Sequence, residues 1–302
     1  MQKIKQKVST YSIKDLEKLS NIKAHTIRIW ELRYKILQPE RTDTNIRYYD
    51  DDQLKKLLNV QALLMNGMKI SNVSKLNAKE MHAALESLLV HSASSNGYSE
   101  MIICRAIAAV AAFDEGTLEK LVDDAIVKTG LENTYRNVLY PMLIRIGHLW
   151  AVNDLMPAYE HFFSYYLERK VFSAINSLPL NANSDETWVL FLIEPEEHEI
   201  GLLMAYYILR KHGKKVIYLG RRVPIEHLEN IVRKCDANSL YTFFVRHQPG
   251  KAVNEHLENL IKITPGLNIY ISSKEGILEN IDAGKNITFI SDINSLIELV
   301  TK

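Results

Sequence analysis

The spacing of apolar residues changes once along this chain, and that change constrains the fold most. From residue 100 to 177 apolar residues recur at helical spacing, with breaks near 113–114, 130 and 154–157. This pattern predicts a bundle of four helices. Beyond Pro179, short β-rich runs alternate with helical stretches, and the runs are 188–193, 215–219, 240–245, 267–271 and 287–290. Because such alternation requires crossover connections, we predict a doubly wound parallel sheet with helices on both faces.

Charge is distributed unevenly over the 302 residues. Residues 1–80 contain 16 Lys and Arg against 9 Asp and Glu, whereas the remainder of the chain is net negative. This asymmetry predicts a module for a polyanion at the N-terminus. A run of small polar residues at 91–98 has no periodicity and is typical of a linker. We therefore expect four segments: a reading head at 1–80, a linker at 81–98, the helical bundle at 99–180 and the α/β domain at 181–302.

Cysteine usage and hydropathy exclude several classes of protein. Cys104 and Cys235 lie far apart without Cys-x-x-Cys or Cys/His spacing, so neither a disulfide framework nor a structural zinc site is expected. The charged N-terminus has no apolar segment behind it, and no run approaches the ~20 apolar residues of a membrane span. We expect a cytoplasmic protein with no membrane partner.

The segment 11–34 contains two helical patterns separated by a tight turn at 20–22, which predicts a helix-turn-helix. The chain continues through Leu37-Gln38-Pro39-Glu40-Arg41 to Arg47-Tyr48-Tyr49 and a helix that opens at Asp51. Over about the first 75 residues this pattern closely resembles the winged DNA-binding domain of MerR-family transcription regulators. The resemblance implies that the partner is a double-stranded DNA operator.

The candidate DNA-binding side chains are polar or cationic and lie on the second helix and the wing. Phosphate contacts set register without reading sequence, so we assign Arg28, Arg41, Arg47 and Tyr48 mainly to the DNA backbone. Lys23 and Thr26 are candidates for base contacts, and Arg33 lies on the same helix. We expect the apolar side chains of Trp30 and Leu37 to lie in the core.

Two ends of neighbouring bundle helices carry a second set of candidates. Trp150 ends one predicted helix, and Glu160-His161 lie at the start of the next, so an indole, a carboxylate and an imidazole can face one opening. Taken singly, Trp150 is more often a core residue and His161 an ordinary helix histidine. The spacing resembles the helical cap over the upper face of cobalamin in methionine-synthase-like modules and in light-responsive MerR-type repressors. In those repressors a histidine follows the tryptophan, whereas here Ala151 follows it.

The loop after the first strand of the α/β domain has the sequence Glu194-Pro195-Glu196-Glu197-His198-Glu199-Ile200-Gly201. Loops at this end of a parallel sheet are where the fold binds ligands. The loop resembles the Asp-x-His-x-x-Gly signature of cobalamin-binding domains, with Glu196, His198 and Gly201 in the signature places. A neutral imidazole is a good ligand for cobalt, and a carboxylate can fix its tautomer. The alternative is a solvated acidic loop with an incidental histidine.

In that family the histidine displaces the cofactor's own dimethylbenzimidazole base, and the nucleotide tail enters a slot beside the sheet. The residues 219–226 match the exit of the second strand in those domains. The slot's Ser-x-Leu corresponds to Thr242-Phe243-Phe244 and its Gly-Gly to Ser272-Ser273, and both changes narrow the slot. Overpacking of that order costs ~1 to 3 kcal/mol. Cobalamin binding is therefore expected to be weakened, altered or lost.

The resemblance covers nearly the whole chain in one order: a winged helix-turn-helix, a four-helix cap and a flavodoxin-like α/β domain. We therefore expect a non-enzymatic MerR-type repressor that binds adenosylcobalamin or methylcobalamin between the cap and the α/β domain. His198 would lie below cobalt, and cofactor state would change assembly of a homodimer or homotetramer on its operator. One alternative is a regulator that has lost the cofactor and uses the domain for docking. Another is a corrinoid carrier for methyl transfer, against which the DNA-binding segment argues.

Overall fold

The computed structural model describes residues 10–91, 95–150, 157–180, 184–194, 196–244, 250–273 and 286–301. Within these ranges the side chains at 89–91, 95–96, 148–150 and 250–254 are left out of the description. The chain divides into two compact units, Met1–Ser164 and Tyr165–Lys302, which we describe separately. Among the described residues, no helix combines the length and the apolar character needed to cross a bilayer.

The N-terminal part of the first unit is a winged helix-turn-helix, as predicted. Its elements are α1 (Ile13–Ser20), α2 (Ala24–Tyr34), β1 (Glu40–Arg41), β2 (Arg47–Tyr48), α3 (Asp51–Met65), α4 (Ile70–Val73) and α5 (Ala78–His91). A capping box between Ser12 and Asp15 starts α1, and Asn21 in the left-handed region ends it. The antiparallel strands β1 and β2 form the wing.

The bundle helices are α6 (Ser95–Ala111), α7 (Glu115–Thr129), α8 (Leu131–Thr134), α9 (Tyr140–Trp150) and α10 (Pro157–Asn176). A π-helical turn, η1 (Tyr135–Leu139), joins α8 to α9, so these segments form one helical run and the predicted number of four long helices is confirmed. The helix α10 passes from the first unit into the second.

The expected linker at 81–98 is wrong for most of its length. Residues up to 91 belong to α5, and α6 begins at 95, so only 92–94 fall outside the described residues. The helix α6 packs directly on α3, and α1 packs on α9. Apolar side chains on these helices, including Leu54 and Ile107, are buried by this contact. Small polar residues at 91–98 suggested a flexible segment, but burial of the flanking helices overrides that local preference.

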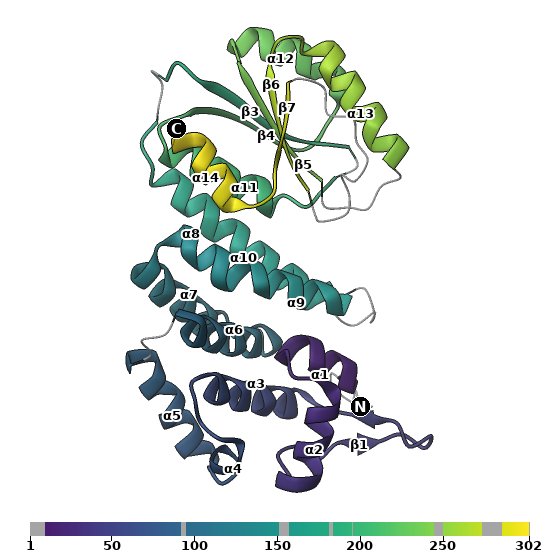
Figure 1. Ribbon diagram of the computed structural model, residues 1–302, viewed down its shortest axis with the longest axis vertical. Helices are drawn as coiled ribbons and strands as arrows, with labels where there is room; N and C mark the ends of the chain where they lie inside the picture. The colour runs from purple at the N-terminus through teal and green to yellow at the C-terminus, as the bar shows by residue number, and fades with distance from the viewer. Residues whose placement is uncertain are drawn as a thin grey trace, which may run out of the picture. The chain divides into compact units, whose positions relative to one another are not determined.

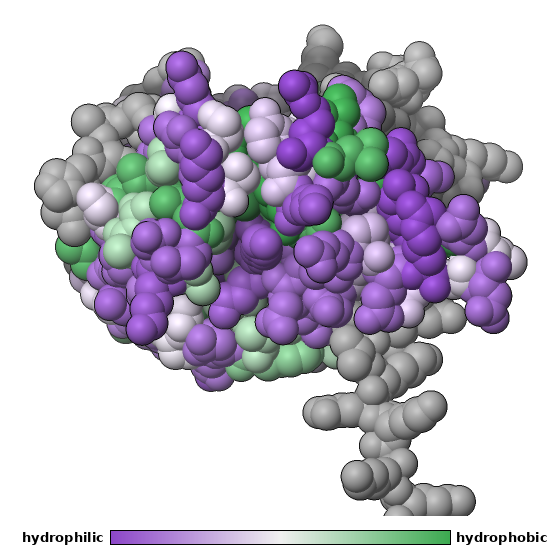
Figure 2. All heavy atoms as spheres, turned by 90° about the horizontal axis from the view of Figure 1, so that it is seen from below, coloured by the Kyte–Doolittle hydropathy of each residue, from purple (hydrophilic) through white to green (hydrophobic). Residues whose placement is uncertain are grey.

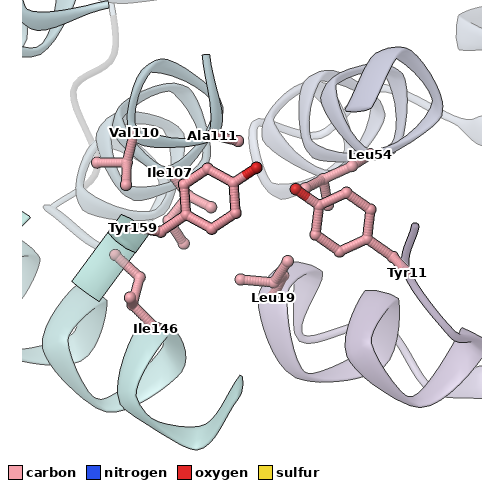
Figure 3. A pocket seen from close by; sticks show the side chains of 8 residues that line it. All are labelled: Tyr11, Leu19, Leu54, Ile107, Val110, Ala111, Ile146 and Tyr159. Atoms are coloured by element: carbon pink, nitrogen blue, oxygen red, sulfur yellow. The ribbon is translucent and has the colours of Figure 1, made fainter. Parts of the chain in front are cut away.

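A hydroxyl pair marks the contact between the winged domain and the bundle inside the first unit. Figure 3 shows the rings of Tyr11 and Tyr159 with their hydroxyl groups turned toward one another, above Leu19 and beside Leu54. The Tyr11 hydroxyl donates to a carboxylate oxygen of Asp51 at 2.7 Å, and the backbone of Tyr11 pairs with the backbone of Tyr49 in an antiparallel bridge. A cavity of about 20 Å³ remains between these side chains. The winged domain and the bundle thus share one apolar joint.

The second unit contains a parallel five-stranded sheet in the order β4-β3-β5-β6-β7 (Figure 1). Its elements are β3 (Thr187–Ile193), α11 (Ile200–Lys211), β4 (Lys215–Val223), η2 (Ile225–His227), α12 (Leu228–Cys235), β5 (Ser239–Phe244), α13 (Gly250–Ile263), β6 (Asn268–Ser273), β7 (Ile287–Ile290) and α14 (Ile293–Thr301). Each predicted strand is present. Because β4 and β5 lie on opposite sides of β3, the strand order reverses there, as in flavodoxin-like folds.

Two apolar layers cover the faces of this sheet. Along a strand, successive side chains point to opposite faces. One face packs against α12 and α13 through residues such as Leu240, Phe244 and Ile271. The other packs against α11 and α14 through residues such as Leu190 and Tyr241. Each side chain near the carboxyl ends of the strands therefore belongs to one layer or the other.

Candidate functional site

The second helix of the helix-turn-helix presents cationic side chains to solvent. Arg28 and Arg33 of α2 are exposed, whereas Ile27, just before Arg28, is fully buried in the core. Lys23 lies at the N-cap of α2, and Thr26 is half-buried one turn later. Seen from the end of the first unit that carries α2 and α4, the surface is mainly hydrophilic (Figure 2). This face can offer guanidinium and hydroxyl groups to phosphates and base edges.

Arg47 and Tyr48, the candidate DNA-binding residues on β2, both contact glutamates of the winged domain. The Arg47 Nε lies 3.1 Å from Oε2 of Glu31, whose other carboxylate oxygen accepts the hydroxyl of Tyr49. Tyr48 donates its hydroxyl to Glu40, and this contact raises the Tyr48 pKa. The contacts to Glu31 hold β2 against α2, and the contact between Tyr48 and Glu40 joins the two strands of the wing.

Two further candidate cations have partners nearby. Arg41 donates from Nη1 to Oδ1 of Asn45 at 2.7 Å, inside the turn of the wing. The Nζ of Lys23 lies 3.1 Å from Glu17, and this contact lowers the pKa of the Glu17 carboxyl. Both cations are exposed, so water screens these contacts and DNA phosphates can compete for them.

The acidic loop after β3 lies at the reversal of strand order, where the fold gathers its ligands. It leads directly into α11, and Gly201 lies in the first turn of that helix. The fold therefore places His198 at the carboxyl edge of the sheet, where the sequence predicted it.

Glu196 and His198 form the geometric centre of this loop. The Nδ1 of His198 lies 2.5 Å from Oε1 of Glu196, which also accepts the backbone N–H groups of Glu197 and His198 at 3.0 and 3.1 Å. The Glu196 side chain is fully buried, whereas that of His198 is 52% exposed. Because a carboxylate accepts, we infer that Nδ1 carries the ring proton. Nε2 is then the ring nitrogen that carries no proton, which is the form in which an imidazole nitrogen ligates a metal.

The other glutamates of the loop are also paired. Oε2 of Glu199 lies 2.7 Å from Nε of Arg221, and Oε1 accepts the Tyr218 hydroxyl at 2.9 Å. Burial, reinforced by the negative charge of Glu199, raises the Tyr218 pKa. Glu197 lies 3.0 Å from Nε of Arg222. Glu196 and Glu199 are buried and hydrogen-bonded, whereas Glu197 and His198 are exposed, so the acidic loop is solvated only in part.

A bulge in β4 brings these arginines to the loop. The register between β3 and β4 shifts after Leu190, so that Phe191 pairs with Gly220. Gly220 has a φ of +75°, and a Cβ there would lie 3.1 Å from Oε1 of Glu199. A glycine is required at this close approach. The strand continues to Val223, four residues beyond the predicted end at 219.

On the bundle, the structure brings Glu160 and His161 together at the start of α10. The Nδ1 of His161 lies 3.0 Å from Oε2 of Glu160, whose other oxygen accepts the Ser164 hydroxyl at 2.5 Å. Trp150 ends α9 as predicted, but its side chain lies outside the described residues, as does Ala151.

Comparison with known proteins decides the family. Residues 11–80 match the MerR HTH family regulatory protein model, and residues 103–172 match a B12 binding domain model. The chain is 31% identical over 225 residues to the HTH-type transcriptional repressor CarH of Myxococcus xanthus, covering 74% of this chain and 75% of CarH. The chain belongs to the MerR-family transcriptional regulators with a B12-binding domain. It is thus a DNA-binding regulator.

Two further similarities fit this MerR-family assignment. The HTH-type transcriptional repressor CarA of Myxococcus xanthus is 22% identical over 258 residues, which cover 84% of this chain and 83% of CarA. The structure of the Methanosarcina barkeri monomethylamine corrinoid protein superposes with a TM-score of 0.53 at 11% identity, over 67% of this chain and 97% of that protein. This second likeness supports the fold alone.

The residues predicted to line the tail slot of this regulator are divided between the two faces of the sheet. Thr242 follows the alternation of Leu240 and Phe244, so it faces the α12/α13 layer with Ser273. Ser272 faces the opposite layer, where its Oγ lies 2.6 Å from the Tyr241 hydroxyl. Side chains on opposite faces cannot line a single slot beside the sheet. The expectation that Thr242 and Ser272 share one is therefore wrong.

Several residues of the regulator's sites were missed at the sequence level. Tyr218, Arg221 and Arg222 were not assigned to the histidine loop from the sequence. Charge gave a signal: two arginines stand at the end of one strand, and four glutamates follow the neighbouring strand at the same sheet edge. Glu31 was also missed, because nothing in a helical pattern marks a buried carboxylate. Leu37 is buried as expected, but Trp30 is only partly buried, so its assignment to the core is wrong.

Proposed function

We propose that this regulator binds a corrinoid of the B12 type through Nε2 of His198. The observation that carries the proposal is the buried Glu196 carboxylate, which holds Nδ1 of the half-exposed His198 ring. A ligating histidine characteristically donates its other ring N–H to a carboxylate, which fixes the tautomer and raises ligand basicity. A bound corrinoid would supply a cobalt centre whose axial ligands can be exchanged.

The ion pairs around the loop support a ligand role for His198. Arg221 and Arg222 hold Glu199 and Glu197, the residues on either side of the histidine in the chain. The loop is therefore anchored on both sides of His198 before any ligand arrives. Preorganisation of this kind lowers the entropy that binding must overcome.

We further propose that the chain represses transcription and that corrinoid binding changes its homo-oligomeric state. Operators read by two-fold proteins require paired recognition helices at helical-turn spacing, so a change in assembly alters DNA affinity. The direct packing of α3 on α6 supports this coupling, because the winged domain is tied to the bundle by an apolar joint. A chromosomal operator implies action in the cytoplasm. The covering of the upper corrin face by Trp150, Glu160 and His161 stays a prediction.

The experiment is a spectroscopic titration of the purified full chain with aquocobalamin, adenosylcobalamin and diaquocobinamide, in the dark and after illumination. Binding is expected to shift the corrinoid absorption bands and to change the molar mass in light scattering. The variant His198→Ala is expected to lose the spectral shift, whereas His212→Ala, at the far end of α11, keeps it. No shift and no co-elution with any of the three corrinoids would contradict the proposal.

A second candidate is a regulator that works without a cofactor. It is favoured by one observation: atoms of the Phe243 ring lie 2.8 and 2.9 Å from where a Cβ on Gly201 would be, so the sheet edge beside His198 is filled. This candidate predicts operator binding and oligomeric mass that do not change when any of the three corrinoids is added.

A further inference from the structure

The route open to a cofactor tail follows from the position of His198. A group that descends from a corrin ring above His198 must pass along one face of the sheet. The histidine loop leads into α11, and Gly201 lies in the first turn of that helix, so the nearest route runs between α11 and β5. The other route runs on the opposite face, beneath α12 and α13.

Phe243 occupies the nearest route. Its ring carbons Cε2 and Cζ lie 2.8 and 2.9 Å from an ideal Cβ on Gly201, closer than real Cβ atoms come to any neighbour. The ring of Phe243 therefore already fills the space that the missing side chain of Gly201 leaves open. No atom of a nucleotide tail can enter between Gly201 and β5 while the ring keeps this position.

A hydrogen-bonded layer closes the same route farther from the loop. Tyr241 points to the same face as Phe243, two residues earlier on β5, and is 2% exposed. The Tyr241 hydroxyl lies 2.6 Å from Oγ of Ser272, and the Ser272 hydroxyl donates to the Ile290 carbonyl at 3.0 Å. These contacts tie β5, β6 and β7 together at the level where a tail would lie. Opening the layer would leave buried hydroxyl groups without partners, which is costly.

Among the residues that the structure describes, the opposite face gives no alternative route. Thr242 faces that side and is fully buried, and its Oγ1 has no hydrogen-bond partner among the described residues. Its neighbours on the face are apolar, with Leu240, Phe244 and Ile271 between 0 and 1% exposed. A phosphate or ribose placed there would lose its hydrogen bonds to water and gain only apolar neighbours, which costs free energy.

We propose that the corrinoid of this chain is one without a nucleotide tail, of the cobinamide class, in preference to complete cobalamin. The inference rests on the proposed function, because it takes His198 as the cobalt ligand. Phe243 is the specificity-determining residue: it fills the slot that a tail would enter, while Glu196 and His198 are left in place for a corrin ring. A corrinoid without a tail needs the histidine but does not need the slot.

The test compares two corrinoids on the full chain by absorption titration: diaquocobinamide, which has no tail, and aquocobalamin, which has one. The measured quantity is the ratio of the two dissociation constants, since the ratio cancels general effects on stability. The variants are Phe243→Ala and the milder Phe243→Leu. The control is Phe244→Leu, which shortens the neighbouring ring on the opposite face of β5.

The wild-type chain is expected to bind cobinamide more tightly than cobalamin. Shortening Phe243 is expected to shift the ratio toward cobalamin by at least about tenfold, whereas the Phe244→Leu ratio stays within about threefold of wild type. Tighter binding of cobalamin by the wild type, or a ratio unmoved in both Phe243 variants, would overturn the inference while leaving the His198 proposal standing. Binding of neither corrinoid would overturn the proposed function itself.

Discussion

The Oε1 atom of Glu196 accepts hydrogen bonds from both the backbone N–H and the ring Nδ1 of His198. One buried oxygen therefore fixes the position of the residue and the orientation of its ring. We propose that His198, held in this way, reaches cobalt through Nε2 without a change of rotamer. The ring therefore loses its rotational entropy when the domain folds, and ligand binding does not have to order it.

Replacing the buried carboxylate tests this relationship. We expect Glu196→Gln to weaken corrinoid binding by about 10- to 100-fold, because an amide cannot accept from all three donors as a charged oxygen does. The matched control is Glu258→Gln, an exposed glutamate of α13 in the same unit that takes no part in the histidine loop. Absorption titration checks both variants. Equal losses in the two would contradict the role assigned to Glu196.

Arg28 should contribute to DNA affinity through phosphate contact. We expect Arg28→Ala to weaken binding to duplexes of different sequence to a similar extent and to reduce the slope of log K against log salt by about 0.9. The control is Lys262→Ala in α13, which removes the same charge from the second unit. Fluorescence anisotropy at several salt concentrations gives both slopes. An unchanged slope for Arg28→Ala would count against the phosphate contact.

The joint between the winged domain and the bundle should be a source of stability. Leu54 is 1% exposed and lines the small cavity together with Tyr11 and Tyr159 (Figure 3). We expect Leu54→Ala to lower the free energy of unfolding of the first unit by about 2 to 5 kcal/mol. Leu32→Ala, at a position 78% exposed, should change it by less than about 0.5 kcal/mol. Urea denaturation followed by circular dichroism measures both, and similar midpoints would refute the buried joint.

Acid should weaken the second unit through Glu186. The Lys214 ammonium, 2.6 Å away, lowers the Glu186 pKa, so this carboxyl is more acidic in the folded state than in the unfolded chain. Its contribution is present above the unfolded pKa and is lost as pH falls through the lower, folded value. We expect Glu186→Gln to flatten the fall of the urea midpoint between about pH 6 and 3, and the exposed Glu226→Gln to leave it unchanged. A wild-type slope in Glu186→Gln would contradict the pairing.

Sequence periodicity was enough to predict the elements and their order. Each expected strand is present because β-rich runs such as 188–193 stay buried on both faces, and burial of that kind leaves a continuous apolar pattern. The linker was mispredicted because local polarity does not report the packing of α6 on α3. The strand face of Thr242 was also beyond the sequence, since a motif fixes order along a strand but a shift of one residue moves every side chain to the other face.

The contact between the two polar residues of the histidine loop was predictable, and its surroundings were less so. The loop motif placed Glu196 beside His198, and the hydrogen bond between them is present. The bulge at Gly220 depends on tertiary register, so the approach of Arg221 to Glu199 could be suspected from charge but not placed. The contact of Phe243 with Gly201 joins residues far apart in the chain, and only the folded sheet reveals it.

Electron paramagnetic resonance of the cobalt(II) state tests the central claim most directly. The full chain, uniformly labelled with ¹⁵N, is loaded with unlabelled diaquocobinamide, which has no base of its own, and reduced. If Nε2 of His198 ligates cobalt, each axial cobalt line splits into a doublet, and His198→Ala removes that splitting. The absence of nitrogen splitting, or a doublet that persists in His198→Ala, would contradict the account.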